Sequence, residues 1–462
     1  MDTLLTKNNF RNNKSNYPSQ QYGVLDLFSG CGGLALGFKH KGFSILESVE
    51  IDKAASKTAG YNLHTNDNKR THSSHKSVLD FTYQGDGGNG KVITIGGPPC
   101  QAYSNIGKAK IKSLGIERFG LNDDRAFLYE EFLRVALEAS SDFIVMENVP
   151  EAVNFLGVNI ASEVCMKLEK NGYKAVWTIL NAADFGVPQT RERLFVFAVK
   201  REAGGEILLP DPTHQKPDKK FKTQNEKRFK SFCSDPYFRE PNKPDKDLPF
   251  WVTTHEAISD LPELLIDSDT EYEYFKPNVR LPYLTEAKND YQKKMRKNTF
   301  NASYVSGNSY RNTARDFRIF EEMHWGDDYR HAYDIAHKIL RREAKRLKVV
   351  QSRHPDKYKE LKKKLVPPYD KNKFFTKWKR LSPHKPSHTL VAHLGTDTYS
   401  HIHPYEPRGI TIREAARLQS FPDDFLFQGS MGDSFKQIGN AVPPLMSEAI
   451  AEAVEKSLNS GV

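Results

Sequence analysis

The stretch that decides the fold is YGVLDLFSGCGGLALGF, residues 22–38. It begins with a short apolar segment typical of a buried strand and ends with the apolar spacing of a helix, and three glycines stand between them. Glycines at this place let the backbone turn tightly and approach a ligand closely. The stretch predicts the strand, turn and helix that open a nucleotide-binding α/β domain, although a structural turn or a nicotinamide-binding turn would look alike.

The same alternation continues along the chain. FSILESVEID predicts a second strand that ends at Glu50 and Asp52, and a helix is expected over Lys53–Leu63. Further strands are predicted at 91–97, at 142–149 and within 171–186 and 191–200, with a helix over 125–140. Strands that alternate with helices favour a parallel sheet that binds its ligand at the carboxyl ends of the strands.

Composition excludes several classes of protein. The chain has 462 residues, of which 38% are hydrophobic, so it is long enough for two or three domains with real cores. It has no run of 18 apolar residues and no secretory signal at its start, so no membrane span is expected. Four cysteines without CxxC spacing exclude a disulfide framework and make structural zinc unexpected.

Positive charge is concentrated in the middle of the chain. Residues 200–380 hold 40 Lys and Arg against 28 Asp and Glu, a net charge of +12, whereas the whole chain carries +10. Concentrated positive charge indicates a polyanion partner, most simply nucleic acid, although a solvated surface would explain it equally well.

The alternating pattern stops near residue 200 and returns near Thr389. We therefore predict a flexible arm over 1–21, the first part of an α/β domain over 22–200, a basic insertion over 201–388 and a return segment over 389–462 that completes the domain. A basic helix is expected within 336–365 and amphipathic helices within 413–425 and 444–458.

Four residues carry the chemistry. Cys100 follows two prolines at a strand end in GGPPCQAYS, a poor context for a packed core side chain, and a helix starting after Gln101 would favour its thiolate. Glu147 closes the buried strand DFIVM, where a carboxylate is unusual unless it is satisfied or functional. Arg191 and Arg193 alternate with a glutamate and share one face, with an exposed ion-pair pattern as the alternative.

Together these segments resemble the DNA (cytosine-5) methyltransferase family. DLFSGCGG, EID, GGPPCQ, ENVP, QTRER, WKRLSPHKPSHTL, REAARLQSFPDDF and QIGNAV occur in the family's order, over roughly 22–200 and 380–460. The resemblance implies an α/β fold: a Rossmann-like S-adenosylmethionine-dependent methyltransferase domain with a smaller target-recognition domain inserted before the C-terminal segment. Double-stranded DNA would lie in the cleft between the two domains.

The resemblance also implies roles for single residues. Cys100 would be the nucleophile, Glu147 would act at cytosine N3, and Arg191 and Arg193 would hold the base and the reacting centre. The S-adenosylmethionine site would comprise Phe28, Cys31, Gly33, Glu50, Asp80, Pro99, Leu128, Asn440 and Ala441. No metal is required.

The chemistry explains these residue types. A thiolate that adds to cytosine C6 makes C5 nucleophilic, and a carboxyl with a raised pKa at N3 stabilises the charge that develops. A duplex hides the base, so the enzyme must flip it out, and Gln101–Asp124 would be the mobile loop that closes over it.

The resemblance suggests the modification enzyme of a bacterial restriction-modification system. Such an enzyme would act as a monomer in the cytosol, associated with the nucleoid when bound to DNA, and a cognate restriction endonuclease could be its genetic partner. Rivals are a tRNA cytosine-5 methyltransferase, a catalytically silent DNA-binding protein and a nicotinamide oxidoreductase. The silent protein would lack Cys100 or Glu147, and the oxidoreductase leaves GGPPCQ and ENVP unexplained.

Overall fold

The computed structural model describes most of the chain. The described residues are 22–64, 72–85, 91–99, 128–155, 157–217, 225–264, 279–297, 303–311, 314–372, 377–395 and 400–460. Three predictions lie outside the described residues: the arm over 1–21, the nucleophile Cys100 and the loop Gln101–Asp124. Among the described residues, no helix combines the length and the apolar content needed to cross a bilayer.

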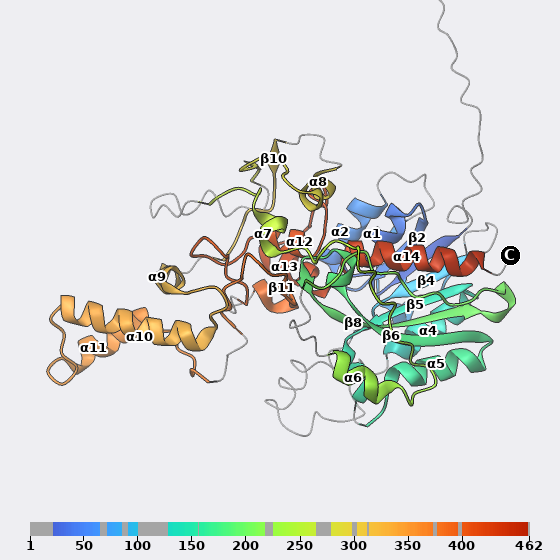
Figure 1. Cartoon of the computed structure of the whole chain (residues 1–462), viewed down its shortest axis with the longest axis horizontal. Coiled ribbons are helices and arrows are strands. Elements are labelled where there is room, and N and C mark those ends of the chain that lie inside the picture. Colours follow the sequence, from blue (N-terminus) through green and yellow to red (C-terminus); the bar gives the residue numbers. More distant parts are fainter. Residues whose placement is uncertain are drawn as a thin grey trace, which may run out of the picture.

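A seven-stranded sheet forms the centre of the larger lobe (Figure 1). Its order is β3-β2-β1-β4-β5-β8-β6. The strands are β1 (Gly23–Leu27), β2 (Ser44–Glu50), β3 (His72–His75), β4 (Val92–Gly96), β5 (Phe143–Asn148), β6 (Tyr173–Asn181) and β8 (Glu192–Lys200). The predicted strands are therefore confirmed, and β1 lies inside the sheet between β2 and β4.

The expectation of a purely parallel sheet is wrong at one strand. β8 runs antiparallel to both β5 and β6, with which it pairs on either side. Only ten residues, 182–191, separate the end of β6 at Asn181 from the start of β8 at Glu192, too few for a helical crossover, so the chain turns back instead. The turn places Arg191 and Arg193 at the end of the sheet where β5 finishes.

Helices cover both faces of the sheet (Figure 1). One face carries α1 (Gly33–His40) and α14 (Pro444–Asn459), which pack so closely that a Cβ on Gly37 would lie 2.4 Å from that of Ser447. The other face carries α4 (Leu128–Glu138) and α5 (Ile160–Lys170). The chain thus returns at its C-terminal end to complete the fold that its first residues open, and α2 (Lys53–Leu63) has the predicted bounds.

Most of the remaining helices and strands belong to the middle and return segments, whereas β7 lies in the first part of the chain. They are α6 (Asn225–Phe232), α7 (Thr254–Ile258), α8 (Asp290–Arg296), α12 (Ile412–Leu418), α13 (Met431–Asn440) and the short strand pairs β9 (Leu281–Pro282) with β10 (Tyr304–Val305) and β7 (Gln189–Thr190) with β11 (Ser387–His388). Ile207, Leu209 and Ile258 pack in the same core as the sheet. The first part of the basic segment therefore packs against the catalytic lobe.

A second core lies in a projecting lobe made of α9 (Ala314–Glu322), α10 (Tyr329–Arg346) and α11 (Pro355–Leu365) (Figure 1). Ile319, Ile335 and Trp378 are among the side chains buried in it. The basic helix expected within 336–365 is confirmed as α11, and the second half of α10 also lies in this range, separated from α11 by residues 347–354. Pro355 explains the second start, because proline fits the first turn of a helix.

Candidate active site

A cavity of about 320 Å³ opens at the carboxyl ends of β1, β2, β4 and β5, beside the C-terminal end of α13. This volume suits a small organic ligand. Nine predicted residues line it: Phe28, Gly33, Glu50, Pro99, Glu147, Arg191, Arg193, Asn440 and Ala441. The structure thus gathers residues that lie more than 400 positions apart in the sequence.

The glycine-rich turn forms the floor of this cavity. Phe28, Gly30 and Gly32 all have positive φ, of 54°, 55° and 88°. Phe28 pays a conformational cost there because it has a Cβ, and such strain is concentrated at ligand sites. Gly33 is required for another reason: an added Cβ would lie 2.5 Å from the carbonyl oxygen of Val442.

Glu50 closes β2 and faces the turn. Its carboxylate accepts the N–H of Gly30 at 2.8 Å and the N–H of Asp52 at 2.7 Å. Burial raises its pKa, although these hydrogen bonds oppose the shift. The carboxylate is therefore held in one position at the cavity wall, which is what a group that binds hydroxyls requires.

Three buried polar atoms along the cavity have no hydrogen-bond partner among the described residues. They are Oδ2 of Asp26, Oγ of Ser29 and Oε1 of Gln437. Burial raises the pKa of Asp26 well above its ordinary value, with Glu50 as the second cause. An unsatisfied buried polar atom is costly. Three of them around one cavity indicate a polar ligand that completes the site.

Glu147 lies on the opposite side of the cavity, near the end of β5. Its Oε1 is 2.9 Å from Nε of Arg193, and both side chains are largely buried. Burial raises the pKa of Glu147, and the positive charges of Arg193 and Arg191 oppose that rise. Gly97 makes room for the carboxylate, because a Cβ there would lie 2.9 Å from Glu147 Oε2. The carboxyl of Glu147 therefore binds a proton more readily than an ordinary glutamate does.

The two arginines do different things. Arg193 contacts Glu147 and also donates to the carbonyl of Glu192 at 2.7 Å. Arg191 is fully buried and donates to the carbonyls of Leu390 at 2.8 Å and Gly439 at 3.0 Å. The alternative of an exposed ion-pair pattern is therefore wrong for Arg191, whose guanidinium fastens the β7–β8 segment to the return segment.

Three of the predicted cofactor residues do not line the cavity. Cys31 is buried behind the turn, with Sγ 3.8 Å from the carbonyl oxygen of Gln437, and burial raises the pKa of its thiol to about 12. Asp80 is exposed at the end of a short helical turn, and Leu128 begins α4. Cys100 directly follows Pro99, which does line the cavity, but lies outside the described residues.

Sequence reasoning missed several lining residues. Asp26 reads as an interior position of an apolar strand, and Ile51 as an ordinary residue after one, yet Ile51 is 68% exposed at the cavity. Asp52 was noted only as the end of a strand. It caps α2 by accepting from Ala54 and Ala55, and it pairs with Lys436 at 2.7 Å across the cavity mouth.

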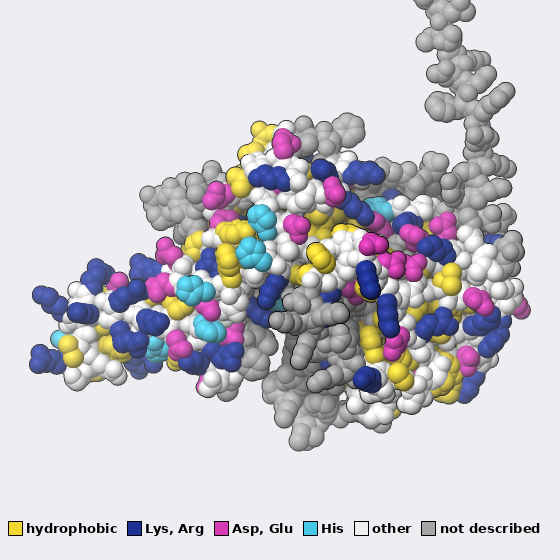
Figure 2. All heavy atoms as spheres, viewed as in Figure 1, with side chains coloured by type: hydrophobic (Ala, Val, Ile, Leu, Met, Phe, Trp, Pro, Cys, Tyr) yellow, Lys and Arg dark blue, Asp and Glu magenta, His cyan; other side chains and the backbone are white. Residues whose placement is uncertain are grey.

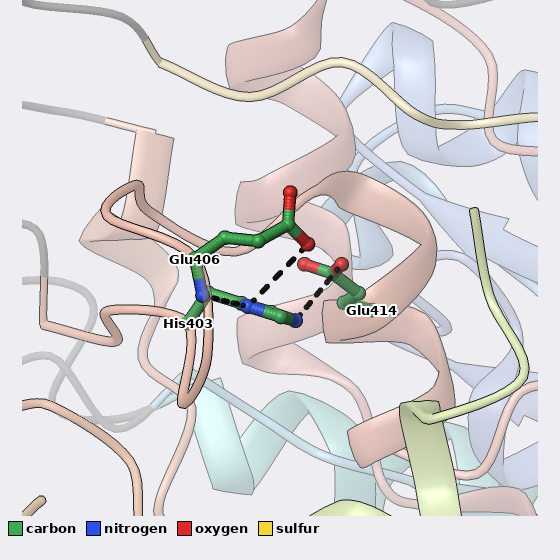
Figure 3. A group of neighbouring side chains, drawn as sticks. All are labelled: His403, Glu406 and Glu414. Atoms are coloured by element: carbon green, nitrogen blue, oxygen red, sulfur yellow. Dashed lines mark hydrogen bonds and ion pairs between the residues drawn. The ribbon is translucent and has the colours of Figure 1, made fainter. Parts of the chain in front are cut away.

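A second cluster of ionisable groups lies between the two lobes. We call this region the junction and define it by the buried charged residues within 403–423 and the residues that they contact. His403, Glu406 and Glu414 lie close enough to offer ligands to a metal ion (Figure 3). The guanidinium of Arg408 already contacts both carboxylates, at 2.8 and 2.9 Å from Glu414 and 2.7 and 3.1 Å from Glu406. The cation of this cluster is therefore an arginine.

His403 completes the cluster as a neutral group. Its Nδ1 accepts the N–H groups of Tyr405 and Glu406 at 3.3 and 2.9 Å, which assigns the ring proton to Nε2, 3.6 Å from Glu414. Burial lowers the pKa of His403 to about 3. The expectation that the reaction needs no metal stays a prediction.

The same junction buries two further arginines. Arg417 contacts the carboxylates of Asp260 and Asp423, and Arg413 donates to the carbonyls of Pro422 and Phe425. The sequence of α12 gave no sign of this, because its charged residues read as the polar face of an amphipathic helix.

Comparison with known proteins agrees with this site. The family model described as C-5 cytosine-specific DNA methylase matches residues 22–456. A protein of Oceanobacillus iheyensis described as a candidate type II methyltransferase, M.OihORF3336P, is 52% identical, over 95% of this chain and 96% of its own. Type II methyltransferase M.AgeI of Thalassovita gelatinovora is 30% identical, over 94% of this chain and all of its own.

A solved structure shares the fold. It is a candidate DNA modification methyltransferase encoded within an Escherichia coli prophage, with a TM-score of 0.62 and 23% identity, covering 95% of this chain and 99% of that one. The chain belongs to the C-5 cytosine-specific DNA methylase family. Membership of this family implies S-adenosylmethionine as the methyl donor.

Proposed function

We propose that this protein methylates C5 of a cytosine within a short, specific sequence of duplex DNA. The observation that carries the proposal is the pair Glu147–Arg193: a buried carboxyl with a raised pKa, beside a guanidinium, on the wall of the cavity that Pro99 also lines. A carboxyl with a raised pKa binds a proton more readily than an ordinary glutamate and can share that proton with a base nitrogen.

The cavity fits S-adenosylmethionine by its chemistry. Bound there, S-adenosylmethionine supplies a methyl group on a sulfonium. Glu50 would hold the ribose hydroxyls, and Phe28 with Ile51 would pack against the adenine. Asp26, Ser29 and Gln437 supply buried acceptors that the chain itself leaves unsatisfied. Asn440 and Ala441 would close the methionine end of the cavity. Asp80 and Leu128 do not line the cavity and would act from outside it, and Cys31 would act by packing behind the turn.

The chain's own residues would activate the base. Cys100, next to Pro99, would add through Sγ to C6 of the cytosine, which makes C5 nucleophilic. Glu147 would hold its proton against N3 and stabilise the negative charge that develops in the ring, while Arg193 keeps the carboxyl oriented and faces the base. After C5 is methylated and loses its proton, elimination of the thiolate restores the ring. Arg191 would act as a positioning residue.

The substrate must enter this cavity as a single base. Cys100 can reach C6 only after the cytosine leaves the duplex, so the enzyme would flip the base, which costs a few kcal/mol. The basic region over 201–388 would hold the duplex, and Gln101–Asp124 would close over the flipped base. In this proposal residues 22–200 and 389–462 form the catalytic domain, and residues 201–388 form the target-recognition region.

The cellular context follows from the relatives. The two named above are described as type II methyltransferases. We place this protein likewise in a bacterial restriction-modification system, as a monomer in the cytosol, with a cognate endonuclease as its genetic partner.

One experiment tests the activity. DNA from a methylation-free host that expresses the chain is sequenced for 5-methylcytosine at single-base resolution, beside a host that expresses Cys100→Ala. Methylation confined to one short motif and absent with Cys100→Ala is the expected result. No methylation of DNA by a folded chain that binds S-adenosylmethionine, with transfer to tRNA instead, would overturn the proposal.

A further inference from the structure

The hairpin of α10 and α11, residues 329–365, carries almost the entire charge excess of the protein. It holds thirteen Lys and Arg against four Asp and Glu, a net charge of +9, whereas the whole chain carries +10. Figure 2 shows the dark blue side chains spread over the projecting lobe that contains both helices. The +12 of the middle segment is thus largely the charge of one helical hairpin.

Most of these charges are available for a partner. Three of the thirteen, Arg330, Arg342 and Arg346, form ion pairs. The other ten are exposed and form no ion pair with any residue that the structure describes: Lys338, Arg341, Lys345, Lys348, Arg353, Lys357, Lys359, Lys362, Lys363 and Lys364. Like charges this dense repel one another, and a polyanion relieves that repulsion.

The hairpin is built to hold these charges in place. The apolar sides of α10 and α11 pack in the lobe's own core, with Ile335, Ile339 and Leu340 buried and Tyr358 and Leu361 packed against them. Asp328 caps α10 and Pro355 begins α11. Both helices are therefore fixed, and their basic sides point to solvent.

The residue types of α11 favour phosphate contact over base reading. Neither helix contains an Asn, Gln, Ser or Thr, and the exposed cations of α11 are all lysines. Lysine meets a phosphate as a point charge, whereas base edges are read mainly by forked or amide side chains. A surface of this kind holds a nucleic-acid backbone without regard to its sequence.

We infer that α10 and α11 form a clamp for the phosphate backbone of duplex DNA that flanks the target sequence. The inference rests on the proposed function, because it takes the same duplex as its partner. The hairpin projects from the body of the molecule (Figure 1). Its 18-residue helix spans about 27 Å, or about eight base pairs. The clamp therefore adds affinity for long duplexes and contributes nothing to base recognition or methyl transfer.

The test compares two duplexes that contain the methylated motif, one of about 14 and one of about 40 base pairs. The full-length variant K359A/K363A removes two exposed lysines one helical turn apart on α11. The matched control K170A/K174A removes two exposed lysines near the start of β6, at the edge of the sheet opposite the cavity. Dissociation constants are measured by fluorescence anisotropy over a series of salt concentrations, and methyl transfer is measured on both duplexes.

We expect K359A/K363A to bind the long duplex about tenfold more weakly, with a salt slope lower by about two. Its binding to the short duplex and its kcat should match those of the wild type, and the control should match on both. Equal weakening on both duplexes, an equal effect of the control, or no change on the long duplex would overturn the clamp. If the wild type methylates neither duplex, the proposed function fails, independently of the hairpin.

Discussion

The cavity buries Glu147 and the junction between the lobes buries Glu414, and the pKa values of these two glutamates shift in opposite directions. Among the described residues, Glu147 in the cavity has one ion pair, with Arg193, and its pKa is raised. Glu414 in the junction accepts two hydrogen bonds from Arg408 and one from the backbone of Thr411, and its pKa falls to about 2. Burial is common to both. At Glu414 the positive charge and hydrogen bonds of Arg408 outweigh burial, whereas at Glu147 burial outweighs the positive charges of Arg193 and Arg191.

The variant Glu147→Gln tests whether the carboxyl in the cavity takes part in catalysis. Glutamine donates a hydrogen bond to N3 but cannot share a proton, so we expect kcat to fall about 10³-fold. Single-turnover transfer of labelled methyl to duplex DNA measures this, with DNA binding as the control for folding. A variant with wild-type kcat would remove Glu147 from the mechanism.

The pH profile sharpens the same prediction. Because the protonated form acts and its pKa is raised, kcat should fall as pH rises through the folded pKa, and this limb should be absent from Glu147→Gln. Stability has the opposite sign: above the ordinary pKa of a glutamate, the raised pKa makes ionisation of Glu147 cost folding free energy. Urea unfolding should therefore find the variant at least as stable as the wild type.

Glu414→Gln is the matched change in the junction. The pKa of Glu414 lies about 2.5 units below its ordinary value, so the charged form contributes about 3 kcal/mol to the free energy of unfolding above pH 4.5. The variant loses this contribution, and the wild type loses it as pH falls towards 2. Urea unfolding at pH 7 measures the loss. Equal stability of Glu414→Gln and Glu147→Gln would show that the two sites do not differ as the contacts indicate.

The sequence predicted the cavity much better than the junction. The turn at Phe28, the carboxylate Glu50 and the pair Glu147 and Arg193 were found because short local patterns mark them and a family resemblance orders them. Phe28, Glu50 and Glu147 meet because parallel strands end at one edge of a sheet, a rule that needs no detailed packing. Arg193 joins them because the antiparallel strand β8 begins at that edge. The domain boundaries and the roles of single residues stay predictions.

The junction could not be predicted because its partners are far apart. Arg417 meets Asp260, which lies 157 positions earlier, and no local pattern records this pairing. The direction of β8 was missed for a similar reason, since alternation of strands and helices does not reveal a strand that turns back. Asp26 was missed because one acidic residue inside an apolar strand gives no pattern.

The smallest effect concerns the histidines beside the junction. His388 and His401 stack with ring centroids 3.8 Å apart, and burial lowers the pKa of both, that of His401 to about 4. Among the described residues, no carboxylate is hydrogen-bonded to either ring. Nε2 of His388 donates to the carbonyl of Ser400, Nε2 of His401 donates to the carbonyl of His388, and Nδ1 of His401 accepts from the hydroxyl of Ser400. The region beside the junction thus buries two imidazoles whose neutral form is favoured, whereas the arginines of the junction are buried in their charged form with carboxylate partners.

His401→Gln tests this remaining difference. A depressed folded pKa gives stability that is complete above the unfolded pKa near 6.5 and is lost as pH falls towards 4, by up to about 1.4 kcal/mol per pH unit. The pH slope of unfolding between 6.5 and 4.5 should therefore be shallower in the variant. The comparison of slopes isolates the imidazole, because Asp184, whose pKa burial raises to about 6, acts in the opposite direction equally in both proteins. Parallel slopes would mean that His401 is protonated at no cost, and that the junction tolerates a charge without a partner.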